Sequence, residues 1–213
     1  MIRYYFTLAL IALVLTGCQK PTMPAKESAL NDRQVIALNG KIALTVEHPD
    51  IVHYFQSSFL CDDSNRMNHQ DFCGDVSTLI ERIYFETVMI SPNQKVIGFA
   101  IGSSELEPDT AVGIYQMESE QSPLTFLTPY YLGNQFIGFS PSGTYFAYQA
   151  DCFEGYCGLY VRQSDTLATR DTINSAEYAD ERTKKVVFSR WISDTEIEYW
   201  LGEQLNTFDF SER

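Results

Sequence analysis

The sequence predicts an all-β protein built from antiparallel hairpins, and three observations support this fold class. Aromatic residues make up 14% of the 213-residue chain, with 13 Tyr and 14 Phe, and aromatic side chains pack well on the pleated surface of a strand. Short apolar runs alternate with turn sequences that contain Asn-Gly or Ser-Pro. Related turns recur at intervals of roughly 50 residues, so a repeated unit of a few antiparallel strands is expected.

The first residues have the pattern of an export signal. Arg3 is followed by an almost unbroken apolar stretch over residues 4–15. This stretch is too short for a bilayer, which needs about 20 apolar residues, but it suits the core of a signal peptide. It ends in the motif Leu15–Cys18, Leu-Thr-Gly-Cys, which resembles the lipobox of bacterial lipoproteins. The resemblance implies that residues 1–17 are a cleaved signal peptide and that the cysteine carries a diacylglycerol thioether; a short helix with an unmodified cysteine is the alternative.

The same resemblance implies a location. Lipoproteins of Gram-negative bacteria receive a third acyl chain, and two or more chains anchor a protein stably. Gln19 stands in place of the aspartate that resembles an inner-membrane retention signal, so the outer membrane, facing the periplasm, is expected in a Gram-negative host. Residues 18–33 are polar, contain Pro21 and Pro24, and are expected to form a flexible tether. Residues 34–213 then form a single β-rich domain.

Four cysteines remain once Cys18 carries the lipid. An even number of cysteines in an exported chain predicts disulfides, and pairing between sequence neighbours joins Cys61 to Cys73 and Cys152 to Cys157. Two other pairings of the same residues are possible. A zinc site is the competing interpretation, but the spacings are not those of paired Cys-x-x-Cys motifs and the expected compartment is oxidising. We therefore expect two disulfides and no metal.

The folded part is expected to begin with a hairpin. Strands over residues 35–38 and 42–46 flank Asn39-Gly40, a favoured two-residue turn because both residues tolerate positive φ. A long polar loop follows, with a short helix expected near residues 50–59. Asp75 is placed to cap a second turn of helix. The apolar residues of that turn, at helical spacing, are Val76, Leu79, Ile80 and Ile83.

The later strands follow turns that are similar to one another. Asn93, Ser142 and Asp194, like Asn39 before them, each lead into an aromatic or aliphatic strand. A period of about 50 residues is typical of a β-propeller blade. The strands expected after the last three turns cover residues 95–101, 144–149 and 195–201.

One copy of the repeat is close to a known pattern. The residues from Phe139 to Tyr148 are Phe-Ser-Pro-Ser-Gly-Thr-Tyr-Phe-Ala-Tyr, and Gly-Leu-Tyr-Val follows at residues 158–161. Together they resemble the repeat of TolB-like and WD40-like β-propellers. The copy at Ile90 has Asn-Gln where that pattern has Asp-Gly, and the copy at Trp191 lacks the proline. The resemblance implies antiparallel four-stranded repeats in a small propeller-like array; a β-sandwich or meander barrel is the alternative.

No constellation of catalytic residues is recognisable, so we expect neither an enzyme nor a cofactor. Residues 138–143 approach the Gly-x-Ser-x-Gly motif, but a proline-containing turn between two strands replaces the strand-to-helix elbow. The three histidines are His48, His53 and His69. The alternative function is a metal site, a ligand site or a hydrolase in the 48–75 loop. It requires His53, His69 and nearby carboxylates to converge in a pocket.

The formal net charge of −13 argues against nucleic acid as a partner, because no basic patch is present to release counterions from phosphates. An acidic, lipid-tethered domain without catalytic residues is expected to bind or scaffold an envelope or periplasmic protein. It would act as an inhibitor or immunity protein, or as an accessory subunit in assembly. The candidate contacts are aromatic loop residues, for which burial in the core is the alternative. They are Tyr130, Tyr131, Phe153 and Tyr156.

Overall fold

The computed structural model describes residues 32–57, 75–104, 109–118, 124–153, 156–174 and 185–211. Four sequence predictions fall outside these ranges: the lipobox with Cys18, the tether before residue 32, the Cys61–Cys73 pair and the position of His69. None of the described helices is long and apolar enough to cross a membrane.

Four antiparallel sheets follow one another along the chain, which confirms the all-β prediction. Sheet A consists of β1 (Val35–Leu38) and β2 (Lys41–Thr45). Sheet B consists of β3 (Ile83–Ile90), β4 (Val96–Ser103), β5 (Asp109–Gln116) and β6 (Leu124–Phe126), and the short strand β7 (Tyr131–Leu132) also pairs with β5. Sheet C consists of β8 (Gln135–Phe139), β9 (Tyr145–Phe153), β10 (Tyr156–Gln163) and β11 (Thr169–Asn174). Sheet D consists of β12 (Val186–Trp191), β13 (Glu196–Leu201) and β14 (Gln204–Asp209).

The first hairpin and the helices form close to where the sequence predicts them, but Ile83, expected on the helix after Asp75, begins the next strand in extended conformation. Asn39 and Gly40 take φ values of 52° and 75° between β1 and β2, which is the left-handed conformation that such a two-residue turn requires. A short 3₁₀ helix, η1 (Asp32–Gln34), precedes β1, and helix α1 (Pro49–Ser57) follows β2. Asp75 caps helix α3 (Val76–Arg82), because its carboxylate accepts a hydrogen bond from the Ser77 backbone N–H at 3.0 Å.

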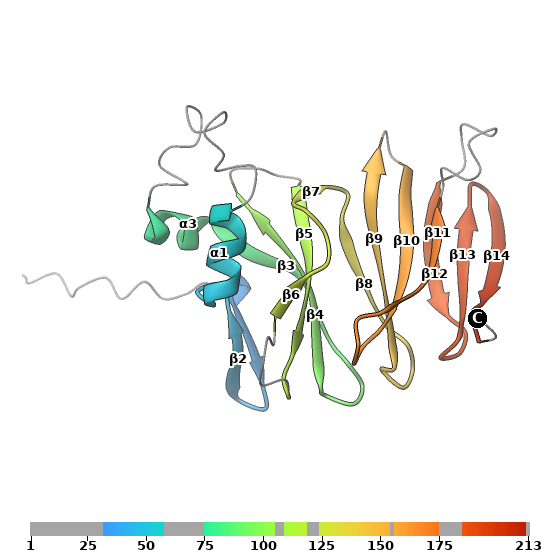
Figure 1. Ribbon diagram of the computed structural model, residues 1–213, viewed down its shortest axis with the longest axis horizontal. Helices are drawn as coiled ribbons and strands as arrows, with labels where there is room; N and C mark the ends of the chain where they lie inside the picture. Colours follow the sequence, from blue (N-terminus) through green and yellow to red (C-terminus); the bar gives the residue numbers. More distant parts are fainter. Residues whose placement is uncertain are drawn as a thin grey trace, which may run out of the picture.

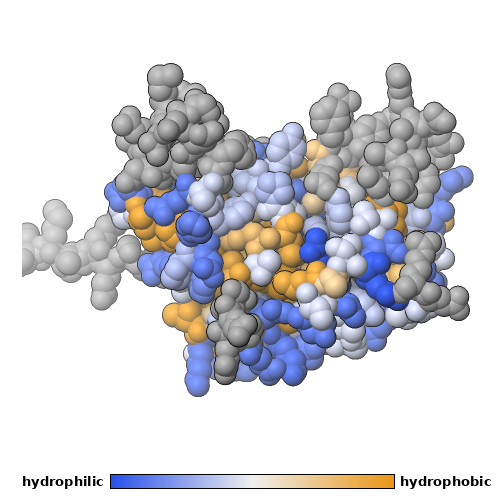
Figure 2. Space-filling view, viewed as in Figure 1, coloured by the Kyte–Doolittle hydropathy of each residue, from blue (hydrophilic) through white to orange (hydrophobic). Residues whose placement is uncertain are grey.

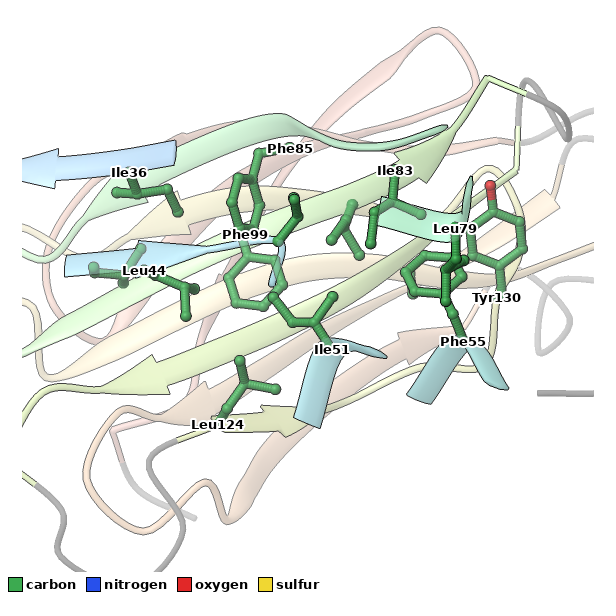
Figure 3. Packing of buried hydrophobic residues seen from close by; sticks show 14 residues of the cluster. Ile36, Leu44, Ile51, Phe55, Leu79, Ile83, Phe85, Phe99, Leu124 and Tyr130 are labelled. Atoms are coloured by element: carbon green, nitrogen blue, oxygen red, sulfur yellow. The ribbon is translucent and has the colours of Figure 1, made fainter. Parts of the chain in front are cut away.

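The sheets stack face to face in an open row, with sheet A at one end and sheet D at the other (Figure 1). Strand β4, in the middle of the row, is buried along its whole length because both of its faces are covered. Ile97, Phe99 and Ile101 belong to a core shared with sheet A and the two α-helices (Figure 3). Val96 and Ala100, on the alternate face of the strand, belong to a core shared with sheet C.

Sheet C is covered on both faces in the same way. Phe146 and Tyr148 of β9 pack toward sheet B, whereas Ala147 between them packs with Leu159 of β10 in the core shared with sheet D. Ile197 of β13 lies in that second core. Each layer of hydrophobic residues therefore joins two neighbouring elements in the row, and the chain buries its apolar surface by stacking one small sheet on the next.

The turns that begin β4 and β9 have the same construction. Ser91 and Ser140 are both buried, and their hydroxyl oxygens accept hydrogen bonds from backbone N–H groups at the start of the following strand, at 3.0 and 3.2 Å. Gln94 and Gly143 occupy equivalent positions, with φ values of 57° and 78°. Glycine adopts this conformation without steric cost, and Gln94 adopts it although it has a side chain. The two turns are therefore structurally equivalent although the motif at Gln94 has changed.

A hydrogen bond joins the corresponding turns of sheets C and D. The Asp194 carboxylate accepts it from the backbone N–H of Ser142 at 2.8 Å. The hydrogen bonds from Ser142 lower the pKa of the Asp194 carboxyl below its ordinary value. The negative charge of Asp194 thus stabilises the contact between two consecutive turns.

Replacing Asp194 with alanine is expected to lower the free energy of unfolding at neutral pH by about 1 kcal/mol, because a hydrogen bond to a partly exposed carboxylate is screened by solvent. Since folding lowers the pKa of this group, its contribution is present above the ordinary carboxyl pKa and is lost as pH falls through the lowered pKa. Urea unfolding of the wild type and the variant should therefore give a difference that shrinks at acid pH. A difference that stays constant with pH would contradict this role for the charge.

The expected four strands per repeat are found only in part. Within the described residues, sheet C has four strands and sheet B has four with β7 in addition, but sheet A has two and sheet D has three. The described sheets form an open row and close neither a ring nor a barrel (Figure 1). Stacking buries the faces of the sheets whatever the number of strands, so the outermost strand can be absent without exposing the core.

Candidate functional site

A disulfide joins the ends of β9 and β10 at the far end of these strands from the Ser140 turn. Cys152 and Cys157 are bonded across a sequence separation of five, with their Cα atoms 4.0 Å apart. The sequence predicts this pair, and the structure contains it. The register between the two strands is irregular between Tyr156 and Gly158, so the disulfide holds the hairpin together where regular strand pairing is interrupted.

The segment before β8 lies directly against this disulfide. A Cβ atom on Gly133 would lie 2.6 Å from the sulfur of Cys152, so the backbone approaches the disulfide more closely than any other residue type would allow. The neighbouring Asn134 is buried. Its amide donates hydrogen bonds to the carbonyl oxygens of Thr110 and Pro129, at 2.9 and 2.7 Å, and the Thr110 hydroxyl donates to the Asn134 carbonyl oxygen. Residues 133 and 134 are therefore held by the disulfide on one side and by hydrogen bonds to Thr110 and Pro129 on the other.

Strand β7 presents two apolar side chains on this fixed support. Tyr131 is 47% exposed and Leu132 is 50% exposed, and the two pair with Thr110 and Asp109 of β5. Burial raises the pKa of the Asp109 carboxyl. We call Tyr131, Leu132 and the adjoining Cys152–Cys157 disulfide the β7 patch. Figure 2 shows that hydrophobic surface gathers over the middle of the molecule on the face in view, with hydrophilic surface below it.

Tyr130 is a core residue, so it is not the surface contact that the sequence analysis proposed. It is 1% exposed, its ring meets that of Phe55 edge to face at 5.4 Å, and its hydroxyl oxygen accepts a hydrogen bond from the backbone N–H of Ser103 at 2.9 Å. Burial raises the pKa of the Tyr130 hydroxyl well above its ordinary value. Its neighbour Tyr131, the first residue of β7, is 47% exposed, so only this one of the two tyrosines can reach a partner.

Phe153 and Tyr156 are opposite each other at the ends of β9 and β10. This places their backbone next to the Cys152–Cys157 disulfide and hence beside the β7 patch. Their side chains fall outside the described residues, so their proposed contact role stays a prediction. The structure thus brings the backbone of three of the four proposed contacts to one end of sheets B and C.

The alternative function requires His69, which lies outside the described residues, so only His48 and His53 can be placed. His48 accepts a hydrogen bond on Nδ1 from the Asp50 backbone N–H at 3.3 Å, and the same nitrogen is 3.7 Å from the Asp50 carboxylate. His53 is exposed on α1 and lines neither of the two described cavities. Within residues 32–57 and the other described ranges, no three His, Cys, Asp or Glu side chains are placed to hold a metal ion.

The larger described cavity lies between the turns of sheets B and C and has a volume of about 410 Å³. Several of its polar groups are paired with one another, whereas the buried hydroxyl oxygen of Ser164 in its lining has no hydrogen-bond partner among the described residues. The Lys95 amine and the Glu118 carboxylate form an ion pair at 2.9 Å, and the Gln116 amide donates to the carbonyl oxygens of Ser164 and Asp165, at 3.1 and 2.7 Å. These residues show no pairing of a nucleophile with a base. The Ser140 turn near the Gly-x-Ser-x-Gly pattern also holds its serine buried and hydrogen-bonded.

No family model matches the chain, and no curated protein is significantly similar to it. The sequence analysis missed Leu132, because a two-residue strand is too short to show an alternating pattern; the Tyr-Leu-Gly sequence before β8 was its only signal.

Proposed function

We propose that this protein is a lipid-anchored module of the bacterial cell envelope that binds another protein through the β7 patch. The Leu-Thr-Gly-Cys motif at residues 15–18 supports lipid attachment at Cys18, which mass spectrometry of the mature N-terminus would check. In a Gram-negative host the module would face the periplasm from the outer membrane. The described chain carries no arrangement that favours catalysis over binding.

The observation that carries the proposal is a pair of half-exposed apolar side chains on a rigid support. Tyr131 and Leu132 follow a tyrosine fixed in the core, and Gly133 lies against the Cys152–Cys157 disulfide. A preorganised surface loses little conformational freedom on binding, which leaves more of the interaction free energy for affinity. Tyrosine is also a common anchor in protein interfaces, since it buries a large area with few rotatable bonds.

The chemistry of the patch indicates the kind of surface that it fits. The exposed apolar side chains match apolar surface on the partner, and the Asp109 carboxyl opposite Leu132 matches a basic or hydrogen-bonding group beside it. The net charge of −13 would speed association with a basic partner at low salt. An inhibitor or immunity protein that neutralises an enzyme in the periplasm fits this description, as does an accessory subunit of an envelope assembly.

The test is a quantitative pull-down from envelope extract with the chain from Gln19 to Arg213, which contains every described residue. Combined replacement of Tyr131 and Leu132 with serine is expected to weaken capture of the specific partner at least tenfold, since loss of an interface anchor costs about 2 kcal/mol. The amount of partner retained at several bait concentrations, measured by mass spectrometry, gives the ratio.

The matched control is Ile42→Ser. Ile42 is an exposed apolar residue on sheet A, at the other end of the row from sheet D, and its replacement removes a similar apolar area from a different surface. It should capture the partner as well as the wild type does. Equal capture by the patch variant and the wild type, with both folded by circular dichroism, would rule out the β7 patch as the contact.

A further inference from the structure

Among the described residues, sheet D has no strand at the position where sheets B and C have their fourth. Strands β4, β9 and β13 each follow one of the repeated turns, so β5, β10 and β14 are the next equivalent strands. The outer edge of β5 is covered by β6 and β7, and that of β10 by β11. Strand β14 is the edge strand of sheet D in the part of the chain that the structure describes, and it lies at the end of the row farthest from sheet A (Figure 1).

The edge of β14 can accept a further antiparallel strand. A two-residue turn joins β13 to β14, and Leu201 pairs with Gln204 on either side of it. Hydrogen-bonded and non-hydrogen-bonded pairs alternate from that point along an antiparallel ladder. The backbone N–H and C=O groups of Leu205, Thr207 and Asp209 therefore point away from β13, toward the free edge.

An apolar row crosses the outer face of sheet D and ends at this edge. Val187 of β12 pairs with Trp200 of β13, and Trp200 pairs with Leu205 of β14. The three side chains are between 41% and 48% exposed, whereas Ile197 and its alternate neighbours on the other face are buried against sheet C. A strand added beside β14 is stabilised most if it places an apolar side chain next to Leu205, because cross-strand apolar pairs stabilise a sheet.

We infer that a second copy of this chain supplies that strand, so that two β14 strands pair antiparallel about a two-fold axis at Leu205. The Leu205 side chains of the two copies then lie side by side, and the two apolar rows join into one row across a continuous six-stranded sheet. When the same edge of two copies pairs about a two-fold axis, the result is a closed symmetric dimer, the commonest form of homo-oligomer. It also covers the exposed edge, which is otherwise a site of uncontrolled association.

Charge selects this register over its neighbours. Glu203 precedes the strand and Asp209 is its last residue. With the axis at Leu205, Glu203 lies opposite the uncharged Thr207 of the other copy and Gln204 lies opposite Asn206. Moving the axis to Asn206 would place Glu203 opposite Asp209, and moving it to Thr207 would place Leu205 opposite Asp209. Like charges or a charge beside an apolar residue disfavour both alternatives.

Cysteine cross-linking tests both the pairing and its register in the full-length chain within its native envelope. Leu205→Cys is expected to form an intermolecular disulfide, because paired residues at the axis have Cα atoms about 5.5 Å apart, within disulfide range. Thr207→Cys is the matched control: the two copies of residue 207 would be separated by four residues along the strand, about 13 Å, and should not cross-link. Non-reducing gels should show a band of twice the mass for the first variant only.

Self-association of residues 19–213 is measured in parallel by sedimentation velocity over a wide range of concentration. The wild type and Ile42→Glu should form a concentration-dependent dimer. Leu205→Glu, which places two like charges side by side at the axis, should remain a monomer with an unchanged circular dichroism spectrum. A wild type that stays monomeric, equal cross-linking of Leu205→Cys and Thr207→Cys, or cross-linking of Leu205→Cys to a different protein would each overturn the inference. If Leu205→Glu does not fold, the cross-linking of the two cysteine variants still tests the pairing, because it does not use that variant.

Discussion

Replacing Phe136 with alanine is expected to lower the free energy of unfolding by about 3–5 kcal/mol, the usual range for removing a large buried aromatic side chain. Phe136 is fully buried in the layer between sheets B and C, with the rings of Phe139 and Phe146 5.4 and 5.9 Å away. Because backbone pairing fixes both sheets, the cavity can close only in part. An effect of this size is a large share of the stability of an ordinary domain.

Urea unfolding followed by circular dichroism measures this loss. Phe139→Ala serves as the matched control, because Phe139 is in the same strand and the same aromatic cluster but is only partly buried. Its replacement should cost clearly less than that of Phe136. Equal losses for the two variants would mean that the deeper burial of Phe136 does not determine its contribution to stability.

Replacing Gly98 with alanine is expected to cost about 3 kcal/mol, because the added methyl group has no space. A Cβ atom at Gly98 would lie 2.0 Å from the ring of Phe136, and that ring is enclosed by its neighbours. Gly98 lies on the face of β4 that packs against sheet C, where the ring of Phe136 occupies the volume that a side chain would fill. The glycine is therefore required by packing between two sheets.

A double-mutant cycle separates this packing role from any effect of alanine on the strand itself. In the Phe136→Ala background the same Gly98→Ala change should cost little or be slightly stabilising, since the methyl group enters the cavity. The coupling between the two sites is then about 2–3 kcal/mol. If Gly98→Ala lowers the free energy of unfolding by the same amount in both backgrounds, contact with Phe136 is not the reason that a glycine is needed at this position.

Local sequence patterns predicted the parts of the fold that depend on near neighbours. The Asn39-Gly40 turn, helix α1 and the Asp75 cap of α3 were all predicted correctly, because their hydrogen bonds and φ values are set within a few residues. The Cys152–Cys157 pair is of the same kind, since the two residues lie at the ends of one hairpin. The strand that follows the Ser91 turn was predicted as well, although it runs two residues farther than expected.

The candidate site could be predicted only in part, because exposure depends on what packs on each face. Tyr130 and Tyr131 are adjacent and chemically identical, yet one is in the core and the other is exposed. A short loop carries no period from which the buried one could be chosen. The support under β7 depends on Asn134, Thr110 and the disulfide, which meet through contacts between separate strands. Nothing near Tyr131 in the sequence indicates that arrangement.

By itself, the sequence determined the all-β class, the positions of the repeated turns and the left-handed conformation of Asn39 and Gly40, because turn chemistry and side-chain alternation act over a few residues. The tertiary structure decided how many strands each sheet has, that the row stays open and which apolar side chains are left uncovered. Ile97 and Val96 are both buried, against different layers, while Trp200 on an equivalent strand is exposed. The physical reason is that each sheet has two faces, and only the stacking of separate segments determines which of them is covered.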